Sequence, residues 1–434
     1  MTKVQTHLPH YLAKLYGGII ALVPFTTLLS VWLSTRFGML DVLAAWKEVV
    51  IFLSAFVVLL WVLRTPRVRE QALTAPWTKM LVTYVALHIL VSVNPLSNGT
   101  LQTSAFVHGL ISNLRYLGFF WVVWVISLET DWLRQHWQKF ILIPAAVVVV
   151  FGLLQITLLP LDALTHVGYG PRTVVAFQTV DNNIDYQRIQ STLRGANPLG
   201  AYLLFILPLV FIVGLKKWQK VVACMFVLVA LYFTYSRSAA VGMAIAVGCF
   251  VFLQKPSQSK KIVAGILAVS TLLLLSATTV APKTVENVLF HTSSSSTSAE
   301  SSNDKRESSM RYGLSYVISH PFGTGAGSSG PASFRNKTPL ISENYYLQIA
   351  EEVGWAGLIL FLFICVSVLK SLFVRRSNEL AAALFASFMG LSFVNVVQHG
   401  WADDTVSLLW WGLAGIAISY TVDKHERKKT TTKA

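Results

Sequence analysis

The sequence predicts an all-α polytopic membrane protein with about twelve transmembrane helices, and three observations lead to this fold class. Hydrophobic residues make up 54% of the 434 residues, and charged residues only 13%, about half the share usual in soluble domains. The mean hydropathy is +0.58. Apolar runs recur along the chain at lengths near the ~20 residues that cross a bilayer as a helix. We therefore expect residues 1–434 to form a single integral membrane domain.

Twelve apolar segments are long enough to be spans. They lie near 15–34, 43–63, 76–94, 105–127, 139–159, 198–214, 219–235, 238–254, 262–281, 354–373, 379–398 and 404–421. The residues before the first segment lack the small-residue cleavage site of a signal peptide, so we expect this segment to remain as a span. The seventh and eighth segments leave room between them only for a tight turn.

The orientation follows from the basic residues. Most of the 35 Lys and Arg residues fall in short loops on one side when the N-terminus is placed in the cytoplasm and the spans alternate. This positive-inside pattern predicts that both termini are cytoplasmic, including the basic tail 422–434. Two long loops, about 160–197 and 282–343, then face the outside. In the second, we expect a polar tract without a core, followed by a short amphipathic helix at Glu307–Ser319 with a Glu307–Arg311 pair.

The charge and the cysteines limit the possible partners. Basic loops at a membrane account for the net charge of +15, so we expect no nucleic acid partner. The cysteines Cys224, Cys249 and Cys365 all lie in apolar runs without CxxC spacing, as small buried hydrophobic residues do. The chain has no DxD sequence and no His/Cys cluster. We therefore expect no metal and no cofactor.

Two arginines on the predicted outer side lie close to helix starts. Arg194, in the stretch Gln190-Ser-Thr-Leu-Arg-Gly-Ala-Asn-Pro-Leu-Gly200, precedes the sixth span, and Asn197-Pro198 is typical of a helix start. A helix N-terminus with an arginine is an anion site. Arg237, in Tyr235-Ser-Arg-Ser-Ala-Ala-Val-Gly242, is held near the membrane surface by its short turn. The alternative for Arg237 is snorkelling to lipid phosphate.

Three more arginines extend this pattern. Arg188 and Arg311 also lie in the outer loops. Arg115 lies about ten residues into the fourth span, where it indicates either a functional site or a structural ion pair. Several arginines near one membrane surface predict a clamp for an anionic lipid head group. A diphosphate fits best, because arginine binds phosphate oxygens bidentately.

An acidic stretch faces the same side. In Ile341-Ser-Glu-Asn-Tyr-Tyr-Leu-Gln-Ile-Ala-Glu-Glu-Val-Gly-Trp-Ala-Gly-Leu358, Glu343 lies at the outer mouth of the tenth span, next to Asn344. Facing an anion clamp, Glu343 is a candidate base for the hydroxyl of an attacking sugar, with Asn344 binding the sugar. The alternative is an acidic residue that matches the helix dipole. We expect Gly354 and Gly357 to allow close packing or a bend.

One more outer turn carries carboxylates. Asp403 and Asp404, in Val396-Val-Gln-His-Gly-Trp-Ala-Asp-Asp-Thr405, have side chains suited to positioning an arginine or the acceptor sugar. The alternative is that Asp404 caps the N-terminus of the twelfth span.

These stretches resemble the O-antigen ligase and polymerase superfamily of bacterial membrane proteins. Its motif of a polar residue, Asn/Ser/Gln, nine residues, Gly, two residues and Gly corresponds here to Glu343-Asn344, Gly354 and Gly357. The stretches around Arg194 and Arg237 are also similar, as is Arg311 before a His-Pro-Phe-Gly-Thr-Gly turn. The likeness extends from about 100 to 420. Ligases of this family have His where this chain has Glu343, which favours a polymerase.

The resemblance implies metal-independent glycosyl transfer from an undecaprenyl-diphosphate-linked oligosaccharide to an acceptor glycan. The reaction would take place on the outer face of the bacterial cytoplasmic membrane. We expect Glu343, Arg237 and Arg311 to be catalytic, and Arg194, Asn344, Arg115, Arg188 and Asp404 to bind substrate. The alternatives are a ligase that transfers finished glycan to a lipid core or a protein, and a transporter with twelve spans.

Overall fold

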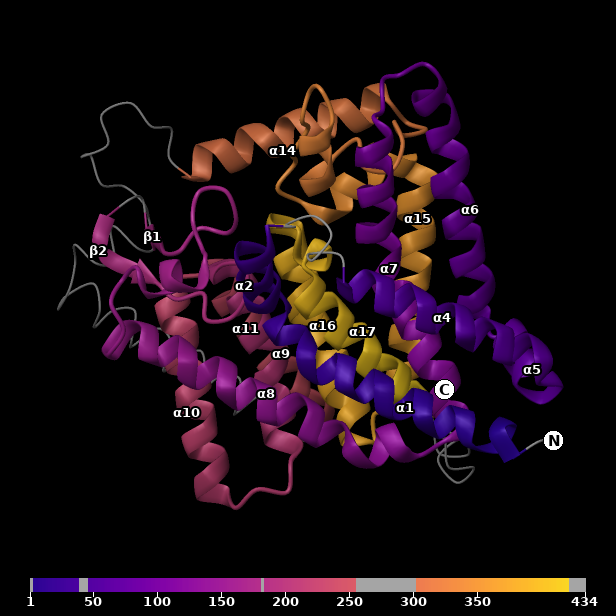
Figure 1. Ribbon diagram of the computed structural model, residues 1–434, viewed down its shortest axis with the longest axis horizontal. Coiled ribbons are helices and arrows are strands. Elements are labelled where there is room, and N and C mark those ends of the chain that lie inside the picture. Colours follow the sequence, from indigo (N-terminus) through magenta and orange to yellow (C-terminus); the bar gives the residue numbers. More distant parts are fainter. Residues whose placement is uncertain (1–2, 39–45, 181–182, 255–301, 421–434) are drawn as a thin grey trace.

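The computed structural model describes residues 3–38, 46–180, 183–254 and 302–420. Helices dominate this part of the chain (Figure 1). They are α1 (Lys3–Leu22), α2 (Thr26–Phe37), α4 (Trp46–Arg64), α5 (Pro66–Thr74), α6 (Pro76–Ser97), α7 (Thr103–Glu129), α8 (Trp132–Thr157), α9 (Ala196–Ile212), α10 (Lys217–Thr234), α11 (Arg237–Gln254), α14 (Ser302–Ser319), α15 (Tyr345–Val374), α16 (Glu379–Val397) and α17 (Asp404–Ile418). Four 3-10 turns are η1 (Val23–Phe25), η2 (Ala163–Val167), η4 (Gly330–Arg335) and η5 (Gly400–Ala402).

A small antiparallel hairpin is the exception to the helices. Its strands β1 (Gln178–Val180) and β2 (Asn183–Arg188) pair Gln178 with Arg188. The hairpin lies in the long loop before α9, where the sequence predicted no secondary structure.

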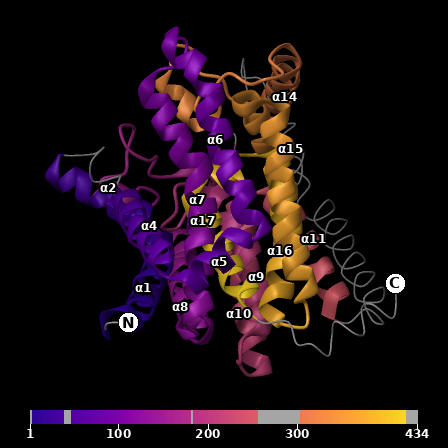
Figure 2. The same cartoon turned by 90° about the vertical axis from the view of Figure 1, so that its right-hand side faces the viewer.

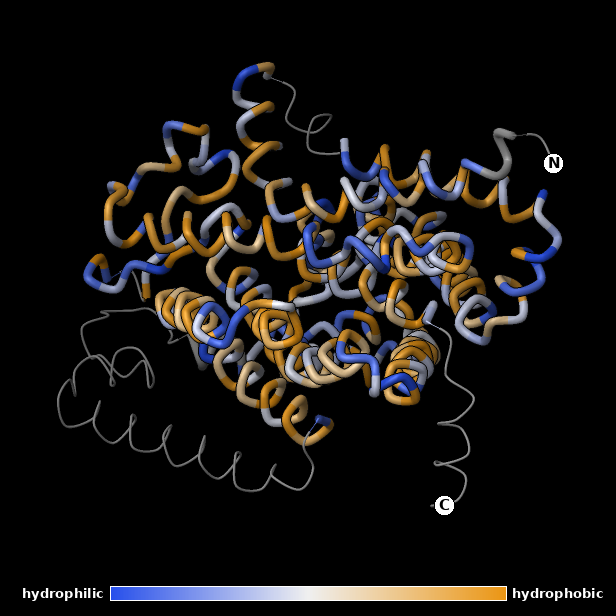
Figure 3. The backbone as a smooth tube through the Cα atoms, turned by 90° about the horizontal axis from the view of Figure 1, so that it is seen from below, coloured by the Kyte–Doolittle hydropathy of each residue, from blue (hydrophilic) through white to orange (hydrophobic). Residues whose placement is uncertain are grey.

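Nine helices in the described residues are long and apolar enough to cross a membrane. Eleven of the twelve predicted spans coincide with described helices, and the predicted span at 262–281 lies outside the described residues. Orange, hydrophobic residues run along the helices, and blue, hydrophilic residues gather at their ends and in the loops (Figure 3). The structure thus agrees with an all-α polytopic membrane protein, while the number of spans stays a prediction.

The first predicted span is longer than expected. Residues 15–34 were predicted, but α1, η1 and α2 form one continuous apolar candidate span, His7–Phe37. Pro24 lies in the 3-10 turn between the two helices, because proline has no backbone N–H to donate to a regular α-helix.

Two short helices form the centre of the bundle. Every residue of α17 is buried, and so are most residues of α9. Trp401, Trp410 and Trp411 are fully buried, and Trp410 and Trp411 pack edge to face with their ring centroids 5.1 Å apart. At ~1.5 Å per residue, α9 and α17 extend only about 22–26 Å. The helices α8 and α16 contact both of them, and α7 contacts α17.

Glycines allow α11 and α16 to cross with their backbones close together. A methyl group at Gly390 of α16 would lie 2.2 Å from the carbonyl oxygen of Gly242 in α11. Small residues that let backbones approach in this way are typical of helix pairs in membranes. The contact fixes α11, and with it the position of its first residue, Arg237.

The helix α14 lies across one end of the bundle, above α15 and away from the loop between α9 and α10 (Figures 1 and 2). It ends at Ser319 before Pro321, as predicted. Its Arg311 donates hydrogen bonds of 2.7 and 3.0 Å to Glu307, which confirms the predicted pair. The helix α15 lies beside α6 (Figure 2). It bends at Gly354, because the φ of 72° at this residue lies outside the range of a right-handed α-helix. The predicted bend is therefore present.

Candidate functional site

A cavity of about 590 Å³ opens beside the N-terminus of α9. Its lining residues are Val175, Phe177, Gln178, Thr179, Arg188, Arg194, Gly195, Asn197 and Pro198. The hairpin and the loop before it form one wall, and the first turn of α9 forms another. The sequence thus correctly placed a helix start here, although α9 begins at Ala196, two residues earlier than predicted. Two predicted arginines, Arg188 and Arg194, share this cavity.

Buried polar residues hold the loop that carries Arg194. Gln190 donates to the carbonyl of Val175 at 2.9 Å, and the main-chain N–H of Ser191 donates to Gln155 at 2.8 Å. The hydroxyl of Thr192 donates to the carbonyl of Pro24 at 2.8 Å. Three separate elements therefore fix the backbone just before Arg194, whose own side chain is exposed.

Arg188 connects two helix ends. Its Nε donates to the carbonyl of Thr234 at 2.8 Å, at the end of α10, and its Nη2 donates to Oδ1 of Asn197 at 2.6 Å, in the first turn of α9. The guanidinium is therefore held in place at the cavity wall before any ligand arrives.

Arg237 is the first residue of α11. The preceding turn places Tyr235 at φ 49°, and Ser236 and Ala239 pack against Gly200 in the second turn of α9. Arg237 is half-buried. It follows the turn that packs on α9, and it does not line the arginine cavity.

Arg311 is placed differently. Its side chain is 80% exposed on α14 and is paired with Glu307. No described contact joins it to the cavity residues. The structure therefore groups Arg188, Arg194 and Arg237 around the start of α9, and leaves Arg311 on a separate helix.

Glu343 precedes the N-cap of α15. Asn344 is that cap, and its side-chain oxygen accepts hydrogen bonds from the N–H groups of Tyr346 and Leu347 at 2.9 and 3.0 Å. Since this oxygen is occupied, only the amide nitrogen of Asn344 is left for the predicted contact with a sugar. Glu343 is half-buried and lies close enough to His399 to interact with it electrostatically.

Two further glutamates of α15 are fully buried. Glu351 accepts hydrogen bonds from the hydroxyls of Ser329 and Ser342, and Glu352 accepts one from the side chain of Asn113 in α7. They bind the loop between α14 and α15 to the bundle. These residues explain why the acidic stretch holds more glutamates than Glu343 alone.

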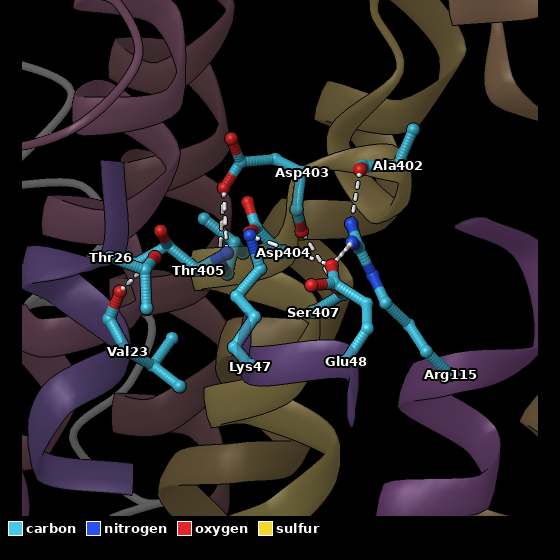
Figure 4. Close-up of polar contacts among 11 residues, drawn as sticks. Val23, Thr26, Lys47, Glu48, Arg115, Ala402, Asp403, Asp404, Thr405 and Ser407 are labelled. Atoms are coloured by element: carbon cyan, nitrogen blue, oxygen red, sulfur yellow. Dashed lines mark hydrogen bonds and ion pairs between the residues drawn. The ribbon is translucent and has the colours of Figure 1, made fainter. Parts of the chain in front are cut away.

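A network of ion pairs lies under the start of α17 (Figure 4). Lys47 of α4 reaches Asp404 at 2.6 Å and Glu48 at 3.5 Å. Arg115 of α7 pairs with Glu48 at 3.1 Å and donates to the carbonyl of Ala402 at 2.9 Å. For Arg115, where the sequence left a functional site or an ion pair open, the structure shows an ion pair.

The capping residue of α17 is Asp403. Its Oδ1 accepts from the N–H groups of Thr405 and Val406 at 3.0 and 3.2 Å. Asp404, the cap suggested by the sequence alternative, instead pairs with Lys47, so that interpretation was wrong by one residue. Burial and the neighbouring Asp404 raise the pKa of Asp403, whereas the positive charge of Arg194 lowers it.

Arg194 thus lies between two groups of residues. On one side it lines the cavity with Arg188. On the other side its charge acts on Asp403, Asp404 and His399. Sequence reasoning missed His399, Lys47 and Glu48. Neither Lys47 nor Glu48 carries a spacing signal, because their partners Asp404 and Arg115 are far away in the sequence.

Residues 221–362 match the family model described as O-Antigen ligase. No curated protein matches the chain. The matched segment contains Arg237, Arg311, Glu343 and the glycines Gly354 and Gly357, which carried the likeness in the sequence. The match confirms the resemblance of this chain to the O-antigen ligase and polymerase superfamily.

Proposed function

We propose that the protein is a bacterial surface-polysaccharide polymerase. The family match supports glycan transfer of the O-antigen ligase or polymerase type. The finer assignment is ours: the protein transfers glycan from an undecaprenyl-diphosphate-linked donor to a sugar hydroxyl of a lipid-linked acceptor. The reaction takes place at the outer face of the cytoplasmic membrane and needs no metal ion.

The observation that carries this proposal is the cavity that holds Arg188 and Arg194 at the N-terminus of α9. A diphosphate there would meet two guanidinium groups and the positive end of a helix dipole. Arginine forms bidentate, charge-assisted hydrogen bonds with phosphate oxygens. When the bond from sugar to diphosphate breaks, this positive charge stabilises the negative charge that develops on the leaving group.

The residues around the cavity divide the remaining work. Arg237 adds positive charge behind the first turn of α9. Glu343 orients the acceptor or assists removal of its proton, and the amide nitrogen of Asn344 contacts the sugar. Arg115 and Asp404 hold the start of α17 against α4 and α7, rather than touching the substrate. We retain Arg311 as a residue that contacts the donor. This contact requires the exposed side of α14 to face the glycan.

The test uses purified protein in lipid nanodiscs and lipid-linked repeat units. Wild-type protein should convert the repeats into a ladder of longer glycans on a gel. Arg194→Ala and Glu343→Gln should abolish the ladder, whereas Arg172→Ala should leave it intact. Arg172 is a matched control, because it is an exposed arginine of the same loop and does not line the cavity. Full activity in Arg194→Ala would refute the proposal.

The second candidate is a ligase, because the matching family model is described as O-Antigen ligase. A ligase would give one shifted band on an added lipid or protein acceptor, and no ladder from repeats alone. The same gel therefore decides between the two activities.

A further inference from the structure

The cavity beside the N-terminus of α9 is larger than a diphosphate. It measures about 590 Å³. The nine non-hydrogen atoms of a diphosphate fill about 270 Å³ at roughly 30 Å³ each, which is the volume of a water molecule in the liquid. A diphosphate at Arg188 and Arg194 would therefore leave about half of the cavity open. The part that remains has about the volume of one sugar ring.

Two apolar side chains line this cavity from the segment just before β1. Val175 and Phe177 are 56% and 40% exposed, whereas Ala176 between them is buried. This alternation is that of an extended chain, in which every second side chain faces the same way. Nε2 of Gln190 donates to the carbonyls of Val175 and Ala176 at 2.9 and 3.2 Å. The backbone before Phe177 is therefore fixed, and its ring presents an apolar surface at the cavity wall.

Two side-chain amides that line the cavity have fixed orientations. Oε1 of Gln178 accepts a hydrogen bond from the N–H of Ala196 at 2.9 Å. Oδ1 of Asn197 accepts one from Arg188 at 2.6 Å. Because both partners are donors, the atom that faces them is the amide oxygen, and the amide nitrogen is left to donate elsewhere. A methyl group at Gly195, which also lines the cavity, would lie 3.1 Å from Nε2 of Gln178, so this nitrogen lies at the cavity wall.

An apolar ring beside oriented N–H donors suits a sugar. The faces of a pyranose ring carry C–H groups, which pack on the electron-rich face of an aromatic ring. Its edge carries oxygen atoms, which accept hydrogen bonds from amide nitrogens. An acyl chain would use only the apolar part of this wall, and an inorganic anion would use only the donors.

We propose that Phe177, Gln178 and Asn197 form the subsite for the sugar that is joined to the diphosphate of the donor. Phe177 packs on one face of the sugar ring, and the amide nitrogens of Gln178 and Asn197 donate to oxygens at its edge. The inference rests on the proposed function, because a diphosphate at the two arginines places its sugar beside the hairpin. The subsite favours a donor that carries glycan over the undecaprenyl diphosphate that remains after transfer.

The experiment measures the affinity of the protein in lipid nanodiscs for two ligands. One is undecaprenyl diphosphate, and the other is the same lipid with the repeat unit that the protein polymerises. Wild-type protein should bind the glycan-bearing lipid at least about fivefold more tightly. Phe177→Ala should lose about fivefold in affinity for that lipid, because the sugar covers only the exposed part of the ring. Its affinity for undecaprenyl diphosphate should stay within about twofold of wild type.

Two further variants serve as controls. Phe177→Tyr keeps the aromatic face and should bind both lipids as wild type does. Ile184→Ala is the matched control, because Ile184 is a 66% exposed apolar residue of β2 in the same hairpin and does not line the cavity. It should also bind both lipids as wild type does.

Gln178→Glu tests the amide independently of Phe177. Glutamate keeps an oxygen for the N–H of Ala196 but has no N–H to donate to a sugar. Its negative charge weakens the binding of both lipids, whereas the lost donor weakens only that of the glycan-bearing lipid. The ratio of the two affinities should therefore fall. If Phe177→Ala does not elute as wild type on size exclusion, this ratio in Gln178→Glu decides.

The outcomes are distinct. A wild-type affinity ratio in both Phe177→Ala and Gln178→Glu would overturn this inference, and the proposed function would stand if Arg194→Ala weakens the binding of both lipids. Equal losses on the two lipids in folded Phe177→Ala would also overturn the inference, because the ring would then only shape the cavity. A wild-type protein that binds neither lipid would overturn the proposed function, and this inference with it.

Discussion

The ion pair between Lys47 and Asp404 should be one of the most sensitive points of the fold. The two charged atoms are 2.6 Å apart, and the side chains are only 15% and 11% exposed. Their attraction is about 6 kcal/mol at an effective dielectric constant of ~20, before the cost of removing both charges from water. Removing one partner from a buried pair costs about 3–5 kcal/mol, because the other charge stays buried without compensation.

We expect Lys47→Met and Asp404→Asn each to lower the free energy of unfolding by about 3 kcal/mol, at the lower end of that range. Partial compensation is the reason. Glu48 remains 3.5 Å from Lys47 when Asp404 is replaced, and Arg194 and Arg115 still act on Asp404 when Lys47 is replaced. The double variant should lose less than the sum of the two single losses, by about 2 kcal/mol or more.

The assay is equilibrium unfolding in detergent micelles, followed by the fluorescence of the buried tryptophans. Lys216→Met is the control, because Lys216 is an exposed lysine in the loop between α9 and α10. Single variants that each lose less than about 1 kcal/mol, with additive losses in the double variant, would refute this reasoning about the buried pair.

Further predictions concern the cap, the glycine crossing and pH. Asp403→Ala removes the cap of α17 and should cost about 1–2 kcal/mol of unfolding free energy in the same assay. Gly390→Ala forces α16 away from Gly242 and should lower the free energy of unfolding by about 1–3 kcal/mol. A variant as stable and as active as wild type would contradict the close approach of α16 and α11 at this position. Burial lowers the pKa of His399 from 6.5 to about 4, so the unfolded chain takes up a proton first as the pH falls. The free energy of unfolding should therefore decrease as the pH falls from about 6.5 to about 4. In His399→Gln this part of the decrease should be missing.

The long apolar helices were predictable because each depends on a local property of the chain, whereas the short helix α5 was not predicted. Apolar runs such as 139–159 and 379–398 have the length and composition of spans, and α8 and α16 coincide with them. The bend in α15 followed from Gly354, and the end of α14 from Pro321. These signals lie within a few residues of the feature that they predict.

Tertiary partners were not predictable in the same way. Two adjacent aspartates look alike in the sequence, so only the structure shows that Asp403 caps α17 and Asp404 binds Lys47. The grouping of Arg188 with Arg194 was expected from their shared loop, and the cavity contains both. His399 had no motif to distinguish it, because the charged groups that act on it, Glu343 and Arg194, come from other loops.

The arginine cavity can be tested most directly by binding of the donor itself. The measurement is the affinity of an undecaprenyl-diphosphate-linked oligosaccharide for the protein in nanodiscs, compared with Arg194→Ala and Arg172→Ala. Because a charge-assisted hydrogen bond contributes about 1.5–3 kcal/mol, we predict that Arg194→Ala binds the donor at least about tenfold more weakly and that Arg172→Ala binds it as tightly as wild type. Equal affinity in all three proteins would contradict the assignment of this cavity to the diphosphate.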